Sequence, residues 1–265
     1  SLPAIILPYV MAVADMGGEK HALKVTELTN DSTLFTVLTY SKMSGNHQYD
    51  RVAKLLDCTK YDAILMQEIP DMDELLQAHP ELTETCNISY VGIRYKSLAL
   101  FTPHKIVFEQ PSKDGNLFVI QSDVLGQVAL LTNRVDKSLN QPVRIQIQQV
   151  SNMLDQLKGV VEVNEVMPTI VAGDFNSTPF NTVHFLMRQE MAYAKPNGFM
   201  NQTFTFPAEG RRIGFLGPLI RIDHIFYRNM ALETAEVLDD SYGSDHYPVK
   251  AEFRLPRQEI NKDSE

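Results

Sequence analysis

One predicted strand ends in groups that could carry chemistry. In the stretch MPTIVAGDFNSTPF, residues 167–180, an apolar run leads into Gly173, Asp174 and Asn176. Asp174 and Asn176 are two residues apart, so their side chains can point to the same side of an extended segment. The glycine lets a backbone or a ligand approach closely. Because α/β proteins place ligands at strand ends, this pattern predicts a binding or catalytic site.

Three other predicted strands carry acid, amide or imidazole groups where they end or begin. Each pair alone has a simpler structural interpretation, because such residues are often solvated, form Asx turns or pair within a core. The combination is harder to attribute to chance, since every group suits the same reaction. The pairs are Gln67 with Glu68, Asp223 with His224, and Asp245 with His246.

That reaction is hydrolysis of a phosphate ester. The substrate is anionic, and attack on it places further charge on the phosphoryl oxygens. A hard divalent cation held by one or two carboxylates would neutralise this charge, which suits Glu68 with help from Asp245. Asp174 can orient and deprotonate the attacking water, and Asn176 can donate to a phosphoryl oxygen.

The basic side chain of His246 completes this set. As an imidazolium it can stabilise the negative phosphoryl group, provided that a carboxylate orients the ring and raises its pKa. Asp223 is the natural partner for it. The sequence therefore predicts that distant segments meet around one cavity able to hold a cation and a phosphate ester.

The elements that must position these groups are short. Helical spacing is clearest over 143–158, where Ile147, Val150, Leu154 and Leu157 share one side. Other helices are predicted over 51–58, 71–79 and 178–189, the last with Thr178 as its N-cap. Strands are predicted over 33–41, 61–68, 90–102, 116–125, 127–135, 169–172, 203–207, 221–228 and 246–255. Strands outnumber helices, which favours an α/β fold with mixed or largely antiparallel sheets.

Composition restricts the organisation and the partners. The chain has 265 residues, of which 44% are hydrophobic and 22% charged, and its net charge is −9. No composition shift marks a boundary, so we expect one domain over 1–265, with an N-terminal arm (1–32) and a C-terminal tail (256–265). The acidic total argues against non-specific DNA binding and against a polybasic membrane tether. Nothing in it indicates an oligomer, and we expect a monomer.

Two segments leave alternatives open. Residues 2–14 are uncharged, too short to span a membrane and without the basic start of a signal peptide. They are interpreted as a core-packing arm, or as the remnant of a signal or membrane segment, in which case a soluble domain would be exported or released. The sequence does not decide whether Cys58 and Cys86 form a disulfide.

At these motifs the sequence resembles the endonuclease/exonuclease/phosphatase superfamily, the DNase I-like metal-dependent phosphoesterases. The matching motifs are Q-E at 67–68, G-D-F-N at 173–176, I-D-H at 222–224 and S-D-H at 244–246. The resemblance implies a four-layer α/β sandwich, two mixed β-sheets face to face with helices outside. It also implies dependence on Mg²⁺ or Mn²⁺, with the roles already inferred for the motif residues.

Two positions depart from the family pattern. Ser41 stands where asparagine is usual, so a hydroxyl replaces a better metal ligand; Asn46, five residues on, could substitute if the loop folds back. Arg134 stands where histidine is common, beside Asn133. We expect Arg134 and Asn133 to contact the substrate phosphate, because arginine is a strong phosphate clamp. Arginine cannot donate a proton near neutral pH.

The sequence thus predicts a divalent-metal-dependent phosphoesterase. Its substrate would be a nucleic acid, a phosphoinositide, a sphingomyelin-type lipid or a small phosphate ester. The segment EGRRIGFLGPLIRID, residues 209–223, combines arginines with apolar residues. It is interpreted as an ordinary loop, or as a rim that meets a phosphate and an apolar substrate group together. The departures at Ser41 and Arg134 support an alternative, a non-catalytic phosphate-binding module on the same scaffold.

Overall fold

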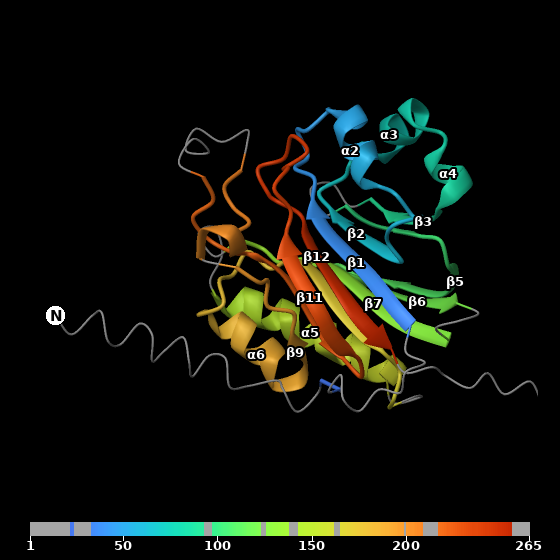
Figure 1. Ribbon diagram of the computed structural model, residues 1–265. Helices are drawn as coiled ribbons and strands as arrows, with labels where there is room; N and C mark the ends of the chain where they lie inside the picture. The colour runs from blue at the N-terminus through green and yellow to red at the C-terminus, as the bar shows by residue number, and fades with distance from the viewer. Residues whose placement is uncertain are drawn as a thin grey trace, which may run out of the picture.

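Two six-stranded β-sheets pack face to face in the computed structural model, with helices outside them (Figure 1). The structure describes residues 22–23, 33–92, 97–122, 126–137, 143–161, 165–198, 200–208 and 217–255. This is the predicted four-layer α/β sandwich. None of the helices in these ranges is long and apolar enough to span a membrane.

The first sheet contains the first and the last strand of the described chain. Its strands β1 and β2 are parallel, and all its other neighbours are antiparallel. In spatial order its strands are β11 (Ala231–Val237), β12 (Val249–Leu255), β1 (Thr33–Ser41), β2 (Ala63–Gln67), β4 (Leu98–Thr102) and β3 (Asn87–Val91).

The second sheet repeats this mixed pattern. Here β7 and β8 are parallel, and the remaining pairs are antiparallel. In spatial order its strands are β5 (Lys105–Pro111), β6 (Gly115–Ser122), β7 (Gly126–Arg134), β8 (Thr169–Asp174), β10 (Asp223–Arg228) and β9 (Ala192–Tyr193). In both sheets a parallel pair therefore ends at one edge, where functional side chains can gather.

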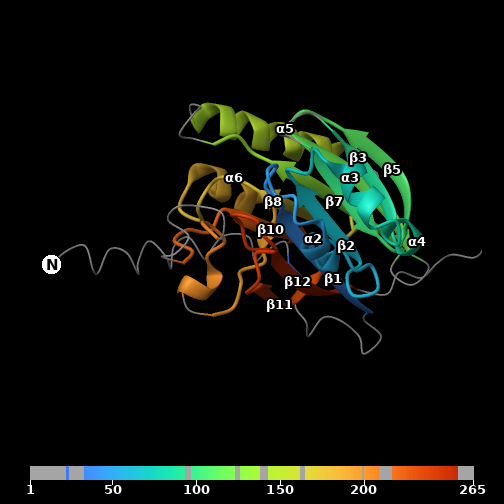
Figure 2. The same cartoon turned by 90° about the horizontal axis from the view of Figure 1, so that it is seen from above.

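Helices cover the outer faces of the two sheets. The outer face of the first sheet packs against α2 (Tyr49–Leu55) and α3 (Met72–Ala78), and α4 (Leu82–Thr85) follows. The second sheet is covered by α5 (Val143–Val161) and α6 (Thr182–Glu190), which lie together on its outer side (Figure 2). A disulfide between Cys58 and Cys86, which the sequence left open, links the segments after α2 and α4.

Strand pleating divides most of the apolar residues between three large cores, and a fourth, small cluster contains Val119, Ala129 and Met167. In β8, Ile170 and Ala172 lie in the core between the sheets, whereas Val171 packs toward α5 and α6. In β1, Val37 lies between the sheets and Leu38 packs toward α2. Each strand that reaches the site is therefore buried on both faces. Its apolar run is continuous, which explains why these strands could be predicted.

Several predicted elements differ from the structure. The expected strand over 90–102 is a pair of antiparallel strands, β3 and β4. Strand β5 is almost wholly exposed and was not predicted, because it lacks an apolar alternation. The helix expected from Thr178 begins later, where the Asn181 side chain accepts from the backbone N–H of Val183 at 3.2 Å. The segment predicted as a strand over 203–207 follows a 3₁₀ turn (Met200–Thr203) and makes one bridge, Phe206 to Ile220.

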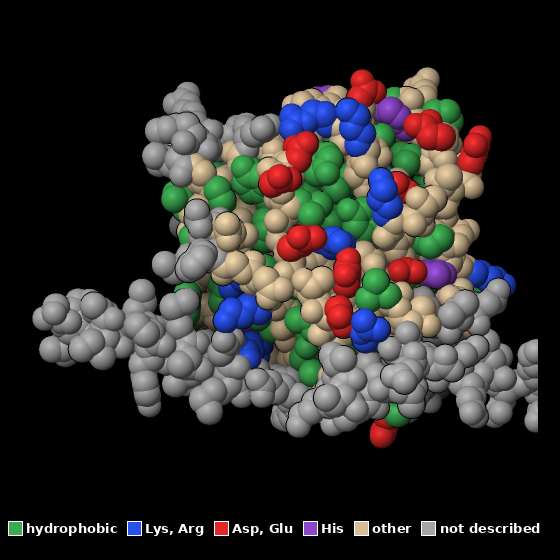
Figure 3. All heavy atoms as spheres, viewed as in Figure 1, with side chains coloured by type: hydrophobic (Ala, Val, Ile, Leu, Met, Phe, Trp, Pro, Cys, Tyr) green, Lys and Arg blue, Asp and Glu red, His purple; other side chains and the backbone are tan. Residues whose placement is uncertain are grey.

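The face shown in Figure 3 carries acidic and basic side chains in alternation, with no extended surface of one sign. Over β11 and β12 they form ion pairs, two of them between the strands and one, Lys250 with Glu252, within β12. Lys250 contacts Glu236 at 3.4 Å and Glu252 at 2.6 Å, and Arg254 contacts Glu233 at 2.7 Å. On this face the acidic and basic groups mainly compensate one another.

Candidate active site

Strand alternation points one set of side chains into the space between the sheets. On five strands the inter-sheet core contains Val37, Leu65, Leu130, Ala172 and Ile225. Residues an even number of positions away face the same side. At the edge where β1, β2, β7 and β8 end and β10 begins, these positions are polar or charged. They hold Ser41, Gln67, Arg134, Asp174 and Asp223.

Asp174, the last residue of β8, is completely buried. Its Oδ1 accepts from the backbone N–H of Asn176 at 2.8 Å, and its Oδ2 accepts from the Asn176 amide at the same distance. The amide also donates to the carbonyl of Val135 at 2.8 Å. Asn176, with φ of 44°, thus turns back to hold the Asp174 carboxylate in one orientation.

Gly173 is required by the neighbouring strand. It lies opposite Asn133 in the parallel ladder between β7 and β8. A Cβ atom at this position would come within 2.2 Å of the Asn133 carbonyl oxygen, closer than any side chain allows. The glycine that the sequence singled out therefore permits the close contact of β7 and β8 directly before Asp174.

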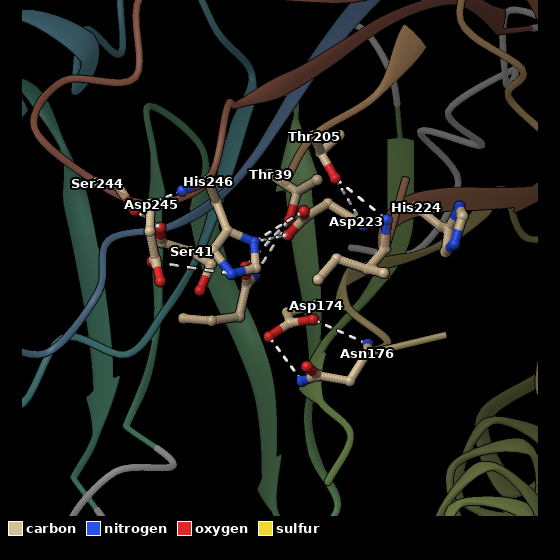
Figure 4. Close-up of polar contacts among 12 residues, drawn as sticks. Thr39, Ser41, Asp174, Asn176, Thr205, Asp223, His224, Ser244, Asp245 and His246 are labelled. Atoms are coloured by element: carbon tan, nitrogen blue, oxygen red, sulfur yellow. Dashed lines mark hydrogen bonds and ion pairs between the residues drawn. The ribbon is translucent and has the colours of Figure 1, made fainter. Parts of the chain in front are cut away.

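Asp223 and His246 form a buried pair. The His246 Nδ1 lies 2.9 Å and 3.1 Å from the two Asp223 carboxylate oxygens. Figure 4 shows the His246 ring between Asp223 and Asp245, with Asp174 close to it. The distance from His246 Nε2 to Asp245 Oδ1 is 3.9 Å. This is the pairing predicted from the sequence, although His246 lies in the loop before β12 and not in the strand itself.

Thr205 positions Asp223, and sequence reasoning did not assign it this role. Its Oγ1 accepts from the backbone N–H groups of Ile222 at 3.1 Å and Asp223 at 3.3 Å. The Thr205 carbonyl accepts from the N–H of Tyr247 at 2.8 Å, which ties the same segment to the His246 loop. The available signal was the segment TFTFP, residues 203–207, which contains Thr205 and which the sequence predicted only as a strand.

The charged groups that act on Asp174 show that side chains from both sheets lie close together at this edge. Burial raises the pKa of Asp174 to about 7. The nearby cations of His246 and Arg134 oppose this shift, and the carboxylates of Asp223 and Glu68 reinforce it. Groups from both sheets therefore lie close enough to influence one carboxyl group. Near neutral pH this carboxyl group can gain or lose a proton, as a general base must.

The His246 imidazole is held in its charged form. Burial alone would lower its pKa, but the carboxylates of Asp223, Asp174 and Asp245 outweigh burial and raise the pKa to about 9. A buried imidazolium surrounded by carboxylates carries a fixed positive charge at neutral pH. His246 can therefore attract an anionic group to this cavity.

Glu68 lies at the sheet edge directly after β2, with an unusual φ of 55°. Its Oε1 accepts from Arg134 through Nε at 2.5 Å and also through Nη2. Its Oε2 lies 3.3 Å from the backbone nitrogen and 3.4 Å from the Oγ of Ser44. The predicted metal ligand and the predicted phosphate clamp are thus paired with each other.

Ser41 and Asn46 occupy different environments. The Ser41 Oγ is buried and has no hydrogen-bond partner in the described part of the chain. The Ser41 carbonyl accepts from the Ser244 hydroxyl at 2.6 Å, which brings the Asp245 loop to the end of β1. The Asn46 amide is already used, since it donates to Tyr242 and accepts from the backbone of Gln48. Of the two, Ser41 has the available ligand atom.

Asn133 and His224 point away from this edge. Asn133 has the same alternation as Leu131, which packs toward α5, and its amide is completely buried. The Nε2 of His224 donates to the Ser177 carbonyl at 2.7 Å, and its Nδ1 lies 3.2 Å from the Tyr193 hydroxyl, on the helix side of the sheet. Burial lowers the pKa of His224 to about 3. The structure therefore does not bring these two side chains to the cavity.

Gln67 has a role that the sequence did not indicate. Its Nε2 donates to Thr39 Oγ1 at 3.1 Å, to Leu65 O at 2.9 Å and to Thr132 Oγ1 at 3.0 Å. Thr39 and Leu65 belong to the first sheet, whereas Thr132 belongs to the second. The Gln67 amide therefore joins the two sheets directly beneath the site.

The donor set fits a hard divalent cation. The ligand atoms of Asp174, Asp223 and His246 lie within 4.8 Å of one another. Because the His246 ring is charged, its nitrogens donate hydrogen bonds, and the carboxylate oxygens are the ligands available to a cation. The Glu68 carboxylate adds oxygen donors, as does the Ser41 hydroxyl, which has no hydrogen-bond partner among the described residues; oxygen is the ligand type that Mg²⁺ and Mn²⁺ prefer. A divalent cation at this edge would also offset the excess of carboxylates. The arrangement can therefore hold a cation, a nucleophilic water and an anionic ester together.

Comparison with known proteins identifies a family and agrees with the fold. The model of the endonuclease/exonuclease/phosphatase family matches residues 37–246, which include every motif at the sheet edge. Two proteins of Vibrio cholerae, both called UPF0294 protein, are 34% identical over 108 residues, or 41% of this chain. The match spans about a third of their own length, 34%.

Solved structures share the architecture at low sequence identity. A mannosyl-6-phosphatase of Bacteroides thetaiotaomicron has a TM-score of 0.67 at 17% identity, covering 83% of this chain and 99% of its own. The human nocturnin catalytic domain with bound sulfate has a TM-score of 0.64 at 14% identity, covering 84% and 97%. Truncated TDP2 of Caenorhabditis elegans has a TM-score of 0.61 at 16% identity, covering 84% and 98%. These similarities establish the fold.

Proposed function

Because the chain belongs to the endonuclease/exonuclease/phosphatase family, we propose that it is a divalent-metal-dependent hydrolase of phosphate ester bonds. One observation carries this proposal. Asp174, Asp223 and His246 come from three distant segments, are all buried, and place their ligand atoms within 4.8 Å of one another. Such a cluster has a high desolvation cost, which a structural role alone does not require.

The cation would be held by Glu68, Asp245 and Ser41. Mg²⁺ or Mn²⁺ supplies a Lewis acid that neutralises charge on the phosphoryl group. Asp174, with its pKa of about 7, accepts the proton of the attacking water. Asn176 keeps the Asp174 carboxylate oriented; its amide is committed to Asp174 and Val135, so its contact with phosphate stays a prediction.

The imidazolium of His246 binds and stabilises the phosphoryl oxygens. Asp223 holds the ring through Nδ1, which leaves the Nε2 N–H directed toward the cavity side of Asp245. Arg134, at the end of β7, is the second cation for the phosphate. Because its guanidinium cannot release a proton near neutral pH, the leaving group must be stable as an anion or take its proton from water.

The substrate class follows from the neighbours only in outline. Among them are a mannosyl-6-phosphatase and a TDP2 of Danio rerio complexed with single-stranded DNA product. For this chain we propose a small or lipid phosphate ester over nucleic acid, because the net charge is −9. The predicted rim falls largely on residues 209–216, which lie outside the described residues. We further propose that the protein acts as a monomer.

The Cys58–Cys86 disulfide supports a location outside the reducing cytosol. Disulfides persist mainly in oxidising compartments. We therefore propose that the protein is exported, in keeping with the uncharged N-terminal stretch. Thiol titration of the unfolded, unreduced protein should find no free cysteine. Two free cysteines would show that the disulfide is absent and would remove this support for export.

A non-catalytic phosphate-binding role is the second candidate, favoured by the Glu68–Arg134 ion pair. Calorimetry separates the two. Binding of a phosphate ligand that is unaffected by metal, without turnover, would support the binding role.

The decisive experiment is a metal titration of hydrolysis. Bis(p-nitrophenyl) phosphate and p-nitrophenyl phosphate would be assayed with Mg²⁺ and Mn²⁺, with and without EDTA. Asp174→Asn should lower kcat/KM by about 10²–10⁴-fold, the contribution of a general base. Asp50→Asn is the matched control, because the Asp50 side chain is 94% exposed on α2. Hydrolysis that survives EDTA, or full activity of Asp174→Asn with native circular dichroism, would contradict the proposal.

A further inference from the structure

The ion pair between Arg134 and Glu68 joins the two sheets at the catalytic edge. Arg134 ends β7 of the second sheet, and Glu68 follows β2 of the first. Their side chains are 12% and 13% exposed, so the pair is largely withdrawn from water. Charge-assisted bonds of this kind are about twice as strong as neutral ones. Glu68 is therefore already neutralised by a cation that the chain itself supplies.

Both oxygens of the Glu68 carboxylate are occupied. Oε1 accepts two N–H groups from Arg134, and Oε2 lies within 3.4 Å of the Ser44 hydroxyl. A divalent cation bound to Glu68 must therefore displace or share these contacts. It would also lie beside a guanidinium whose charge cannot be removed by loss of a proton. Both effects weaken cation binding to the protein alone.

The Arg134 guanidinium also acts on the centre of the site. Its charge lowers the proton affinity of Asp174, and His246 acts on the same carboxyl group. A tetrahedral dianion placed among these groups would accept hydrogen bonds from Arg134 in the fork geometry that guanidinium favours. The dianion would compete with Glu68 for the guanidinium and leave the Glu68 carboxylate free.

We propose that Arg134 is an internal counter-ion of Glu68 that couples metal binding to phosphate binding. In the protein alone, Arg134 holds Glu68 and the divalent cation binds weakly. When a phosphate group binds, Arg134 moves its hydrogen bonds to it, and Glu68 then accepts the cation. Each ligand raises the affinity for the other by the same factor, as linkage requires. This inference rests on the proposed function, because it takes Glu68 as the metal ligand.

Mn²⁺ binding tests the coupling without any turnover. The free ion would be followed by electron paramagnetic resonance, with sulfate as a tetrahedral dianion that is not hydrolysed and complexes Mn²⁺ only weakly. We expect saturating sulfate to tighten Mn²⁺ binding to the wild type at least about 10-fold, a typical coupling. In Arg134→Gln, Mn²⁺ alone should bind at least about 10-fold more tightly than to the wild type, and sulfate should change its affinity less than about 3-fold.

Two control variants locate the effect. Arg254→Gln removes an arginine from a surface ion pair with Glu233 and should bind Mn²⁺ like the wild type. Glu68→Gln should abolish tight Mn²⁺ binding in the wild-type background with sulfate present, and in the Arg134→Gln background with Mn²⁺ alone. Melting temperatures and circular dichroism would establish that each variant is folded.

Other outcomes overturn the inference. It is wrong if Arg134→Gln binds Mn²⁺ no more tightly than the wild type, if no variant binds Mn²⁺, or if sulfate leaves the wild-type affinity unchanged. Hydrolysis measured in parallel separates this failure from that of the proposed function. Metal-dependent turnover without the affinity change would reject the coupling alone. The expected affinities without turnover of any phosphate ester would reject the hydrolase alone.

Discussion

A buried ion pair under the catalytic edge gives the most direct test of how the site is held. Lys42 follows β1 and is completely buried. Its Nζ lies 2.8 Å from both carboxylate oxygens of Asp71 and 2.6 Å from the carbonyl of Asn46, and it lies over the Tyr49 ring. These contacts fix the loop that carries Ser44 to Glu68. Lys42 should therefore stabilise both the fold and the site.

The expected cost follows from the burial of both partners. Burial lowers the pKa of Lys42, and its contacts with Asp71 offset only part of this effect. In Lys42→Met the Asp71 carboxylate would remain, 7% exposed, with the Tyr49 hydroxyl at 2.8 Å and the ring Nδ1 of the exposed His47 at 3.3 Å. Removing one partner of a buried pair costs about 3–5 kcal/mol. Because Tyr49 still donates at 2.8 Å, we expect the lower end, about 3 kcal/mol.

Equilibrium urea unfolding, followed by far-UV circular dichroism with the disulfide intact, measures this difference. The double variant Lys42→Met/Asp71→Leu should recover most of the loss, to within about 1 kcal/mol of the wild type, because no uncompensated charge remains. The argument would be refuted if Lys42→Met lost less than about 1 kcal/mol, or if the double variant were as unstable as the sum of the single changes.

Three further predictions concern parts of the fold that support the site. Burial holds the pKa of His184 well below its usual value, so as pH falls below about 6.5 the imidazole takes up a proton only in the unfolded state. The free energy of unfolding should therefore fall with decreasing pH by up to about 1.4 kcal/mol per pH unit more in the wild type than in His184→Gln, as urea unfolding would measure. The Cys58–Cys86 bond spans 28 residues, so the double serine variant should lose about 3.6 kcal/mol in the same assay, and a loss below about 1 kcal/mol would count against the bond. Gly173→Ala must push β8 away from the Asn133 carbonyl, since the added Cβ would lie 2.2 Å from it; it should lower both thermal stability and Asp174-dependent turnover, whereas Gly159→Ala, with nothing within 4 Å of the added Cβ, should not.

The site residues that could be predicted are those that a local sequence pattern identifies. Asp174 and Asp223 were found because each adjoins a continuous apolar run, and alternation by two residues then fixes the face they share. The pairing of Asp223 with His246 followed from chemistry, because a buried imidazolium requires a carboxylate. The structure has now placed these atoms within hydrogen-bond distance.

Contacts between distant side chains could not be predicted in the same way. No local pattern shows that Arg134 meets Glu68, or that Lys42 is completely buried against Asp71. Both contacts depend on how loops at the ends of parallel strands fold back over the sheet edge. Strand β5 escaped prediction for the opposite reason: six of its seven residues are exposed and the seventh is half-buried, so the strand has no buried face.

The site is divided between the two sheets, and this division explains the buried polar residues beneath it. Ser41 and Glu68 belong to the first sheet, and Asp174 and Asp223 to the second, so the distance between sheets sets the geometry of any ligand between them. An apolar interface is not directional and tolerates small displacements of one sheet against the other. The hydrogen bond of Gln67 to Thr132 is directional and crosses the interface beside the proposed active site, while the bond to Thr39 holds the Gln67 amide within the first sheet.

The interface therefore combines two kinds of interaction with separate tasks. The apolar core between β1, β2, β7, β8 and β10 supplies the free energy that holds the sheets together. The Gln67 amide fixes their relative position, because an amide that loses a buried partner pays a desolvation cost of about 1–3 kcal/mol. His246 makes a second directional contact between the sheets, because it belongs to the loop before β12 of the first sheet and binds Asp223 of the second sheet. The geometry of the proposed active site then depends on directional bonds at the edge, whereas stability depends mainly on the apolar layers below it.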